Sequence, residues 1–467
     1  MAESFNQTFI RAYRYIRSSP VRTALAVVVL VILLVLLFLG VQFVAQQRGS
    51  LALLNGLNLL LIPLLLIGAV VWLANTWKGT QMEMARLRDE RALVDGYYDR
   101  LTDLLLSRNL RGAAPDDEVA RAARAHTLTT LRQLDGDGRG QIVRFLYESS
   151  LLSAEQPAVD LQAADLSASD LSHVHMAGVS LRNVDLRGAR LVEADMPGSD
   201  LREAQLERAD LSRANLAESY LRGATLRDAL LTGAQLHGAI LTKASLVGGN
   251  LRDVDLSEAN LSGADLTGAD LSGANLKGAR LNGATLTEAI LDGANLSLAN
   301  LSKATLTRVQ ATATDFSGAN LAGASLVGAR LNESVFGAAI LSEADLTDAE
   351  LREANLNLAN LRGAIMNQAI LTCANLRWAN LNNANLTGAD LTEVDLTDAE
   401  VSPQILAKAR SVSKVERSDS APHYDVVPTG AGTREGPLPT AQRPTYQRPP
   451  GKTPEPPPPT GGSSSQP

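Results

Sequence analysis

The feature that most constrains this 467-residue chain is an apolar residue at every fifth position from residue 161 to residue 401. Leucine occupies 42 of the 49 positions in this register, and the exceptions are Met176, Met196, Ala311, Phe316, Phe336, Met366 and Val401. Five residues advance an α-helix by about 140° beyond one full turn, so the leucines would scatter around a helix. An odd period would also send successive leucines to opposite faces of a flat strand. Neither regular element accommodates the pattern.

A chain that turns a corner every five residues resolves this conflict. The residue two places before each central position is always small, so it can point inward beside the leucine while the other three residues face out. The stretch LSGADLTGADLSGANLKGAR, residues 261–280, contains the units ADLTG, ADLSG and ANLKG. These units resemble the A-[DN]-L-x-x pattern of the pentapeptide-repeat family. The resemblance implies a mainly β fold, a right-handed quadrilateral β-helix with four units, or twenty residues, per coil.

The unusual central residues support a twenty-residue coil. Met176, Met196, Phe316 and Phe336 are separated by multiples of twenty, which stacks them on one wall. About twelve coils at the spacing of adjacent strands predict a solenoid roughly 60 Å long. Asn and Asp frequently precede the leucine, where their side chains can bond the turning backbone. In residues 308–316 a leucine and an alanine are both replaced, which predicts a local void or distortion.

The N-terminal part predicts a membrane anchor. Residues 24–45 contain no charge and are long enough to span the ~30 Å hydrocarbon core as a helix. The alternative, a signal peptide, is disfavoured because the apolar run is long and no A-x-A site follows it. Residues 51–75 predict a second span after an external turn at 46–50, and 1–23 form a basic N-terminus.

The distribution of Lys and Arg predicts the orientation of this hairpin. Basic residues flank both spans on the side away from the turn, which places both termini and the repeat domain in the cytoplasm, at the inner (plasma) membrane. Asn55 and Asn58 in the second span leave an oligomeric channel or transporter component as an alternative.

Residues 76–158 predict a cytoplasmic helical segment. Leu87, Val94 and Leu101 are seven apart and indicate an amphipathic helix, which either packs on its neighbours or forms a short coiled-coil seam. A second helix starts near residues 115–118, and the glycine-rich stretch DGDGRG, 135–140, predicts a turn that ends it. The apolar residues of the helix that follows, among them Ile142, are expected to cover the open end of the repeat domain, 159–410.

The C-terminal residues 411–467 are rich in Pro, Ser, Thr and Gly, and this composition predicts a disordered tail or a ligand for a proline-reading domain. Residues 405–409 are expected to cover the last coil.

Candidate ligands in the chain are sparse. Asp135 and Asp137 lack the later acids of a calcium loop, and His173 and His175 lack a third ligand for zinc. Cys373, the only cysteine, excludes an intramolecular disulfide. The sequence therefore predicts no catalytic, cofactor-binding or metal-binding residue, and no cofactor.

The charge balance narrows the function. Residues 160–401 contain 18 basic and 31 acidic residues, a net charge of -13, which argues against direct nucleic-acid binding. The leading hypothesis is a membrane-anchored, non-enzymatic scaffold that presents an acidic rod to a protein partner or to copies of itself, with the lipid bilayer as a further partner. The resemblance implies an alternative, a DNA mimic that binds topoisomerases, as some members of the family do.

Overall fold

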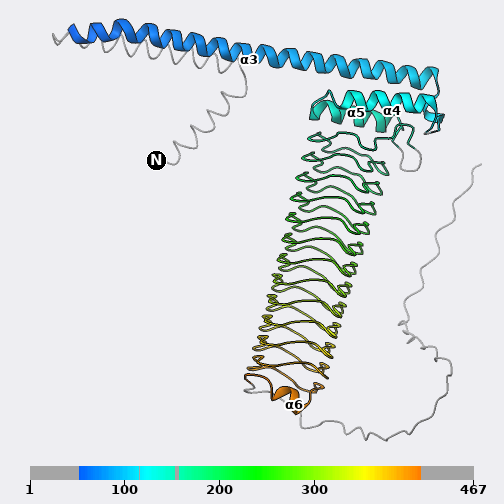
Figure 1. Cartoon of the computed structure of the whole chain (residues 1–467), viewed down its shortest axis with the longest axis vertical. Helices are drawn as coiled ribbons and strands as arrows, with labels where there is room; N and C mark the ends of the chain where they lie inside the picture. Colours follow the sequence, from blue (N-terminus) through cyan, green and yellow to red (C-terminus); the bar gives the residue numbers. More distant parts are fainter. Residues whose placement is uncertain (1–51, 115, 153–156, 412–467) are drawn as a thin grey trace, which may run out of the picture. The chain divides into compact units, whose positions relative to one another are not determined.

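The computed structural model describes residues 52–114, 116–152 and 157–411. Helices precede and follow a long stack of coils (Figure 1). These elements are α3 (Ala52–Ser107), the 3-10 helix η1 (Leu110–Gly112), α4 (Glu118–Leu131), α5 (Gly136–Glu148) and α6 (Pro403–Leu406).

The coils repeat every twenty residues, as the sequence predicts. Parallel bridges join residues twenty apart, from Asp165↔Asp185 to Asn380↔Glu400. In the coil that begins at Leu261, the Leu261 amide donates to the Arg280 carbonyl at 2.7 Å, and the Asp265 amide donates to the Ala244 carbonyl at 2.9 Å. Each five-residue unit contributes one bridge residue and one turn, so within the described residues the coils contain bridges and turns in place of longer strands.

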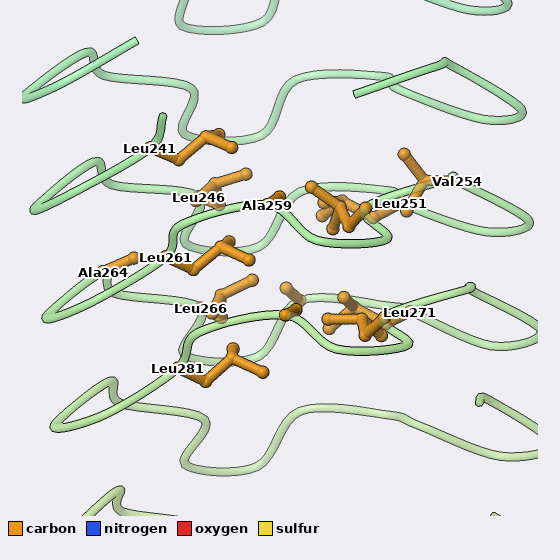
Figure 2. Close-up of a cluster of buried hydrophobic side chains, with 14 of the residues drawn as sticks. Leu241, Leu246, Leu251, Val254, Ala259, Leu261, Ala264, Leu266, Leu271 and Leu281 are labelled. Carbon is orange, nitrogen blue, oxygen red and sulfur yellow. The ribbon is translucent and has the colours of Figure 1, made fainter. Parts of the chain in front are cut away.

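The core of the solenoid is a set of stacked leucine columns. Leu241, Leu261 and Leu281 lie one above another in successive coils, and Leu251 and Leu271 form a second column across the interior (Figure 2). These leucines are fully buried, because the small residue two places earlier leaves room beside each one. Each buried leucine contributes ~1.5–3 kcal/mol, so stacking is the main source of stability.

At residues 308–316, where a void or distortion was predicted, the bonds between coils continue, but the Thr314 amide donates to Ser334 Oγ at 3.4 Å instead of bonding within its own turn. The Ala311 amide still donates to the Arg330 carbonyl at 2.8 Å, and the Phe316 amide to the Val335 carbonyl at 2.7 Å. Phe316 stacks on Phe336 with ring centroids 4.8 Å apart and planes 5° apart. Two large rings in adjacent coils therefore occupy the core at the level where a leucine is missing, and the ladder continues unbroken.

Helix α5 covers the first coils of the solenoid. Contrary to the sequence expectation, DGDGRG does not make a turn: Asp135 is the N-cap of α5, and its carboxylate accepts from the Gly138 amide at 3.0 Å. Gly136 and Gly140 lie on the solenoid backbone, so close that a Cβ on Gly140 would be under 3.0 Å from the Asp170 carbonyl oxygen. Gly136 and Gly140 therefore allow α5 to pack closely against the first coils. Ile142 is fully buried, as predicted.

The opposite end is covered by α6. Ser402 caps this short helix by accepting from the Ile405 amide, and Leu406 is buried. The prediction that residues 405–409 cover the last coil is confirmed, because the Gly388 amide donates to the Lys408 carbonyl at 2.9 Å. The predicted tail, apart from its first residue, lies outside the described residues.

Helix α3 packs on α4 through its C-terminal half. Val94 and Leu101 are buried as predicted, whereas Leu87 is exposed. The hydroxyl of Tyr97 lies 2.8 Å from Thr127 Oγ1, and burial raises the pKa of this phenol above its ordinary value. The predicted amphipathic face therefore packs within the chain along part of its length.

The expected membrane placement requires correction. Across the residues that the structure describes, no helix is both long enough and apolar enough to span a bilayer. The basic N-terminus, 1–23, the first expected span, 24–45, and the external turn, 46–50, lie outside the described residues. The second span, 51–75, does not form a separate element, because α3 continues through it into a charged stretch that begins at Lys78. The prediction of a multi-pass inner-membrane protein with cytoplasmic termini, and the channel hypothesis built on it, are therefore withdrawn.

Candidate interaction surfaces of the solenoid

The Asp and Asn residues that precede the leucines are structural. Asp265 shows the arrangement: its Oδ1 accepts from the Thr267 amide at 3.1 Å and from Thr267 Oγ1 at 2.6 Å. The same bond, from the amide two residues on, is made by Asp165, Asp170, Asp185, Asp210, Asn215, Asp255, Asn260, Asp270, Asn295, Asp315, Asp345, Asn360, Asp390 and Asp395, among others. The prediction that these residues hold the corners is confirmed.

The residue two places after each central position takes a left-handed conformation. From Ala163 to Asp398, all 48 such positions have φ between 51° and 71°, and 18 of them are glycine. Their side chains stand at the corners of the coil, where no core contact limits their size. The sequence analysis did not anticipate this conformation, although the frequency of glycine at this position was an available signal.

Ion pairs couple neighbouring coils across the outer surface. Arg213 pairs with Glu193 at 2.5 Å, and Arg252 pairs with Asp270 at 2.6 Å. Arg187 holds both oxygens of Asp185, and these bonds lower the pKa of that carboxyl below its ordinary value. Arginines are thus interleaved with the acids, and over the described coils the net negative charge is not gathered into one continuous acidic face.

The residues weighed as metal ligands do not come together. His173 lies 3.1 Å from Glu193, and His175 lies 3.3 Å from Asp195, and both histidines point outward at exposed positions. Across the described parts of the chain, no group of three His, Cys, Asp or Glu side chains could hold a metal ion. Cys373 is exposed, and its thiol has a raised pKa, because desolvation and the nearby Glu393 both oppose the thiolate.

A cavity of about 460 Å³ lies on the helical segment, beside α3 and the start of α5. Its polar groups bond to one another: Arg86 lies 3.9 Å from both Glu90 and Asp135, and Glu90 accepts from the Asp135 amide at 3.0 Å. Since the described residues that line this cavity include no nucleophile beside a base, the outer surface of the solenoid is the better candidate for function.

Comparison with known proteins identifies the repeat. The family model described as pentapeptide repeats matches overlapping stretches that together run from residue 160 to residue 402, more than half of the chain. No curated protein matches this chain.

Several solved structures are similar to the solenoid. HetL, a pentapeptide repeat protein involved in heterocyst differentiation regulation in Nostoc sp. strain PCC 7120, is 33% identical, with a TM-score of 0.24, over 49% of this chain and 89% of its own. QnrB1, a plasmid-mediated fluoroquinolone resistance protein, is 20% identical, with a TM-score of 0.27, over 41% of this chain and 92% of its own. A pentapeptide repeat protein of the Arabidopsis thaliana thylakoid lumen is 31% identical, with a TM-score of 0.17, over 24% of this chain and 68% of its own.

Proposed function

Because the chain belongs to the pentapeptide-repeat family, we propose that it is a non-enzymatic scaffold whose β-helix presents outward side chains to protein partners. One observation carries this proposal. The inward residues and the Asx residues before each leucine are committed to the fold, whereas the two residues after each leucine differ widely in size and charge on a rigid, regularly spaced backbone. Such a frame positions contacts at intervals of ~4.8 Å along a flat surface, which suits recognition of an extended protein surface.

The DNA-mimic alternative receives less support from the charges. A surface that imitates DNA needs a continuous row of free negative groups at regular spacing. Here the acids that precede the leucines are engaged by backbone amides, and several of the remaining acids are paired with arginines of the next coil. No wall of the described solenoid therefore presents an uninterrupted row of free carboxylates.

The test is proximity labelling in the cell of origin, with a labelling enzyme fused to the full chain. The matched control keeps every inward residue and every corner Asx, but replaces the two residues after each leucine with Ser-Gly or Thr-Gly. Residues 261–270 already have this sequence, LSGADLTGAD, so the control uses units that the fold accepts. We expect a set of proteins that the native chain labels and that the control does not.

Two results would overturn the proposal. One is an identical labelled set for the native chain and the Ser-Gly control, since partners would then not read the outward residues. The other is hydrolase or transferase turnover by the purified chain that a single substitution abolishes, since this would show an enzyme. Protection or inhibition of a topoisomerase by the purified chain would instead favour the DNA mimic.

A further inference from the structure

Three bulky apolar residues at left-handed corner positions lie in one column. Among the 30 described non-glycine residues with positive φ at these corners, only Leu298, Leu358 and Trp378 carry a large hydrocarbon side chain. They differ by multiples of twenty and therefore share one of the four corners of the coil. The two residues between them in this column are Gly318 and Ala338, so five consecutive coils present only nonpolar residues there. We call these five residues the apolar ridge.

The ridge works against the stability of the isolated chain. Leu298 is 65% exposed, Leu358 57% and Trp378 47%, and each has a φ between 54° and 61°. A bulky side chain is disfavoured in this conformation, and the exposed half or more of each side chain gains no burial in the isolated chain. Glycine, which occupies 18 of these positions, or a polar or charged residue, as at most of the others, would expose less hydrocarbon to water. Exposed apolar residues that do not stabilise the fold, yet are aligned in one row, indicate a binding surface.

The ridge is also continuous. The side chain of Leu298 leans over Gly318, where an added Cβ would lie 2.9 Å from Leu298 Cδ2. Beside Ala338, in the same coil, Ile340 is 41% exposed on the adjoining wall. Nonpolar residues therefore occupy this corner in every coil from that of Leu298 to that of Trp378.

Charge is nearly absent around the ridge. The ridge residues, their preceding neighbours and the residues two places after them make up fifteen positions from Ser297 to Asn380, and Arg377 is the only charged one. Arg377 lies over the Trp378 ring at 4.9 Å and pairs with Asp395 at 3.7 Å. The equivalent fifteen positions at the preceding corner, from Asp292 to Asn375, include five charged residues.

From this row we infer that the apolar ridge binds the same ridge of a second copy of the chain, antiparallel, about a twofold axis at the coil of Ala338. Leu298 and Trp378 are each two coils from Ala338. When one copy is reversed about this axis, Leu298 of each copy therefore faces Trp378 of the other, and the two Ala338 residues face each other. Residues 160–401 carry a net charge of -13, and because this corner carries almost none of it, two copies can approach here with little repulsion. The inference rests on the proposed function and names one partner of the scaffold.

The contact is small. Four coil spacings make the ridge about 19 Å long, which corresponds to the low end of interface sizes. We therefore expect a weak dimer, with a dissociation constant in the micromolar range, that forms when copies are held at high local concentration.

Sedimentation of the purified full chain over a wide concentration range tests the dimer. The variant Leu358→Gly/Trp378→Gly should weaken dimerisation at least tenfold while its thermal midpoint stays the same or rises, since glycine relieves both corners. The control Gln368→Gly/Asn383→Gly changes two uncharged left-handed residues at other corners and should dimerise like the native chain. A native chain that stays monomeric, or a ridge variant that dimerises as well as the native chain, overturns the inference.

Cysteine cross-linking tests the axis. In a Cys373→Ser background, Ala338→Cys should form a disulfide between copies under mild oxidation, because two Ala338 positions meet at the axis. Ala313→Cys is the matched control, since Ala313 is also an exposed alanine with positive φ, but it lies at another corner. Equal cross-linking of the two variants overturns the inference.

A photo-cross-linker attached to the new thiol of the Ala338→Cys variant shows which molecule contacts the ridge: a second copy of the chain or residues 412–467 of the same chain. Products that join position 338 to the ridge of an isotopically distinct copy support the inference, and products that join it only to residues 412–467 of its own chain overturn it. All of these results are independent of whether the labelling experiment finds other partners, so failure of the dimer and failure of the scaffold are distinguishable.

Discussion

At the scale of single residues, two inward-facing serines differ in what their hydroxyls contact. Ser334 Oγ donates to the Ala311 carbonyl at 2.5 Å and lies 3.4 Å from the Thr314 amide, whereas the buried hydroxyl of Ser169 has no partner among the described residues. We expect Ser334→Ala to lower the free energy of unfolding by about 1–2 kcal/mol, although alanine is the commonest residue at this position. Ser169→Ala should leave it unchanged or raise it. Thermal unfolding followed by circular dichroism measures both, and equal effects would contradict the argument.

Asp390 ties the last coils to the closing segment. Bonds from Ser411 and Thr392 to its carboxylate, together with Arg410, hold its pKa below the ordinary value. A lowered folded pKa means that this stabilisation is complete above the unfolded value of about 3.9 and is lost as pH falls through the folded pKa. Hydrogen exchange should therefore show residues 403–411 protected at pH 7 and less protected in acid.

The substitution Asp390→Asn should reproduce this acid effect at pH 7. The control is Asp265→Asn, since Asp265 makes the same bonds to its own turn but none to a closing segment. If both variants left residues 403–411 fully protected at pH 7, the carboxylate of Asp390 would not be what holds the segment.

At the scale of elements, the contact between α5 and the first coils depends on glycine. Gly140→Ala would place a methyl group under 3.0 Å from the Asp170 carbonyl oxygen, so the helix must move off the coil. The helix propensity gained, about 1 kcal/mol, is smaller than the lost packing, and we expect net destabilisation of roughly 1–3 kcal/mol. Gly96→Ala in α3 is the control, because no described atom beyond its own helix lies within 4 Å of the added Cβ, and it should be neutral or stabilising. Denaturant unfolding measures both.

These glycines also show why some elements could not be predicted. In DGDGRG, local propensity favours a turn, and only the nearness of Ala168 and Asp170 in a separate coil explains why glycine stands at positions 136 and 140 of a helix. The coil, by contrast, is specified locally, since every unit repeats the inward leucine and small residue. The corner role of residues such as Asp265 was predictable for the same reason. The apolar ridge was not, because its five residues lie twenty positions apart and become neighbours only once the coils stack.

At the scale of the whole molecule, stability should be a sum over coils and their contacts, because each coil contacts chiefly the coils above and below it. Deleting residues 261–280 removes one full coil and joins Asn260 to Leu281, which leaves every column in register. We expect this variant to fold, to unfold cooperatively within a few degrees of the native chain, and to keep its ridge-mediated dimer, since the ridge lies entirely after the deletion.

Deleting residues 263–280 removes two fewer residues but breaks the register. Ser262 would join Leu281, and the leucines after the junction could not stack on those before it without unwinding part of a coil. Although less sequence is lost, we expect a separate transition at lower temperature and proteolytic cleavage near the junction, measured by calorimetry and limited proteolysis. If the two deletion variants unfolded alike, stacking of coils in register would not be what makes this chain one cooperative structure. The placement of the ridge residues, twenty positions apart, at one corner would then lose its physical basis as well.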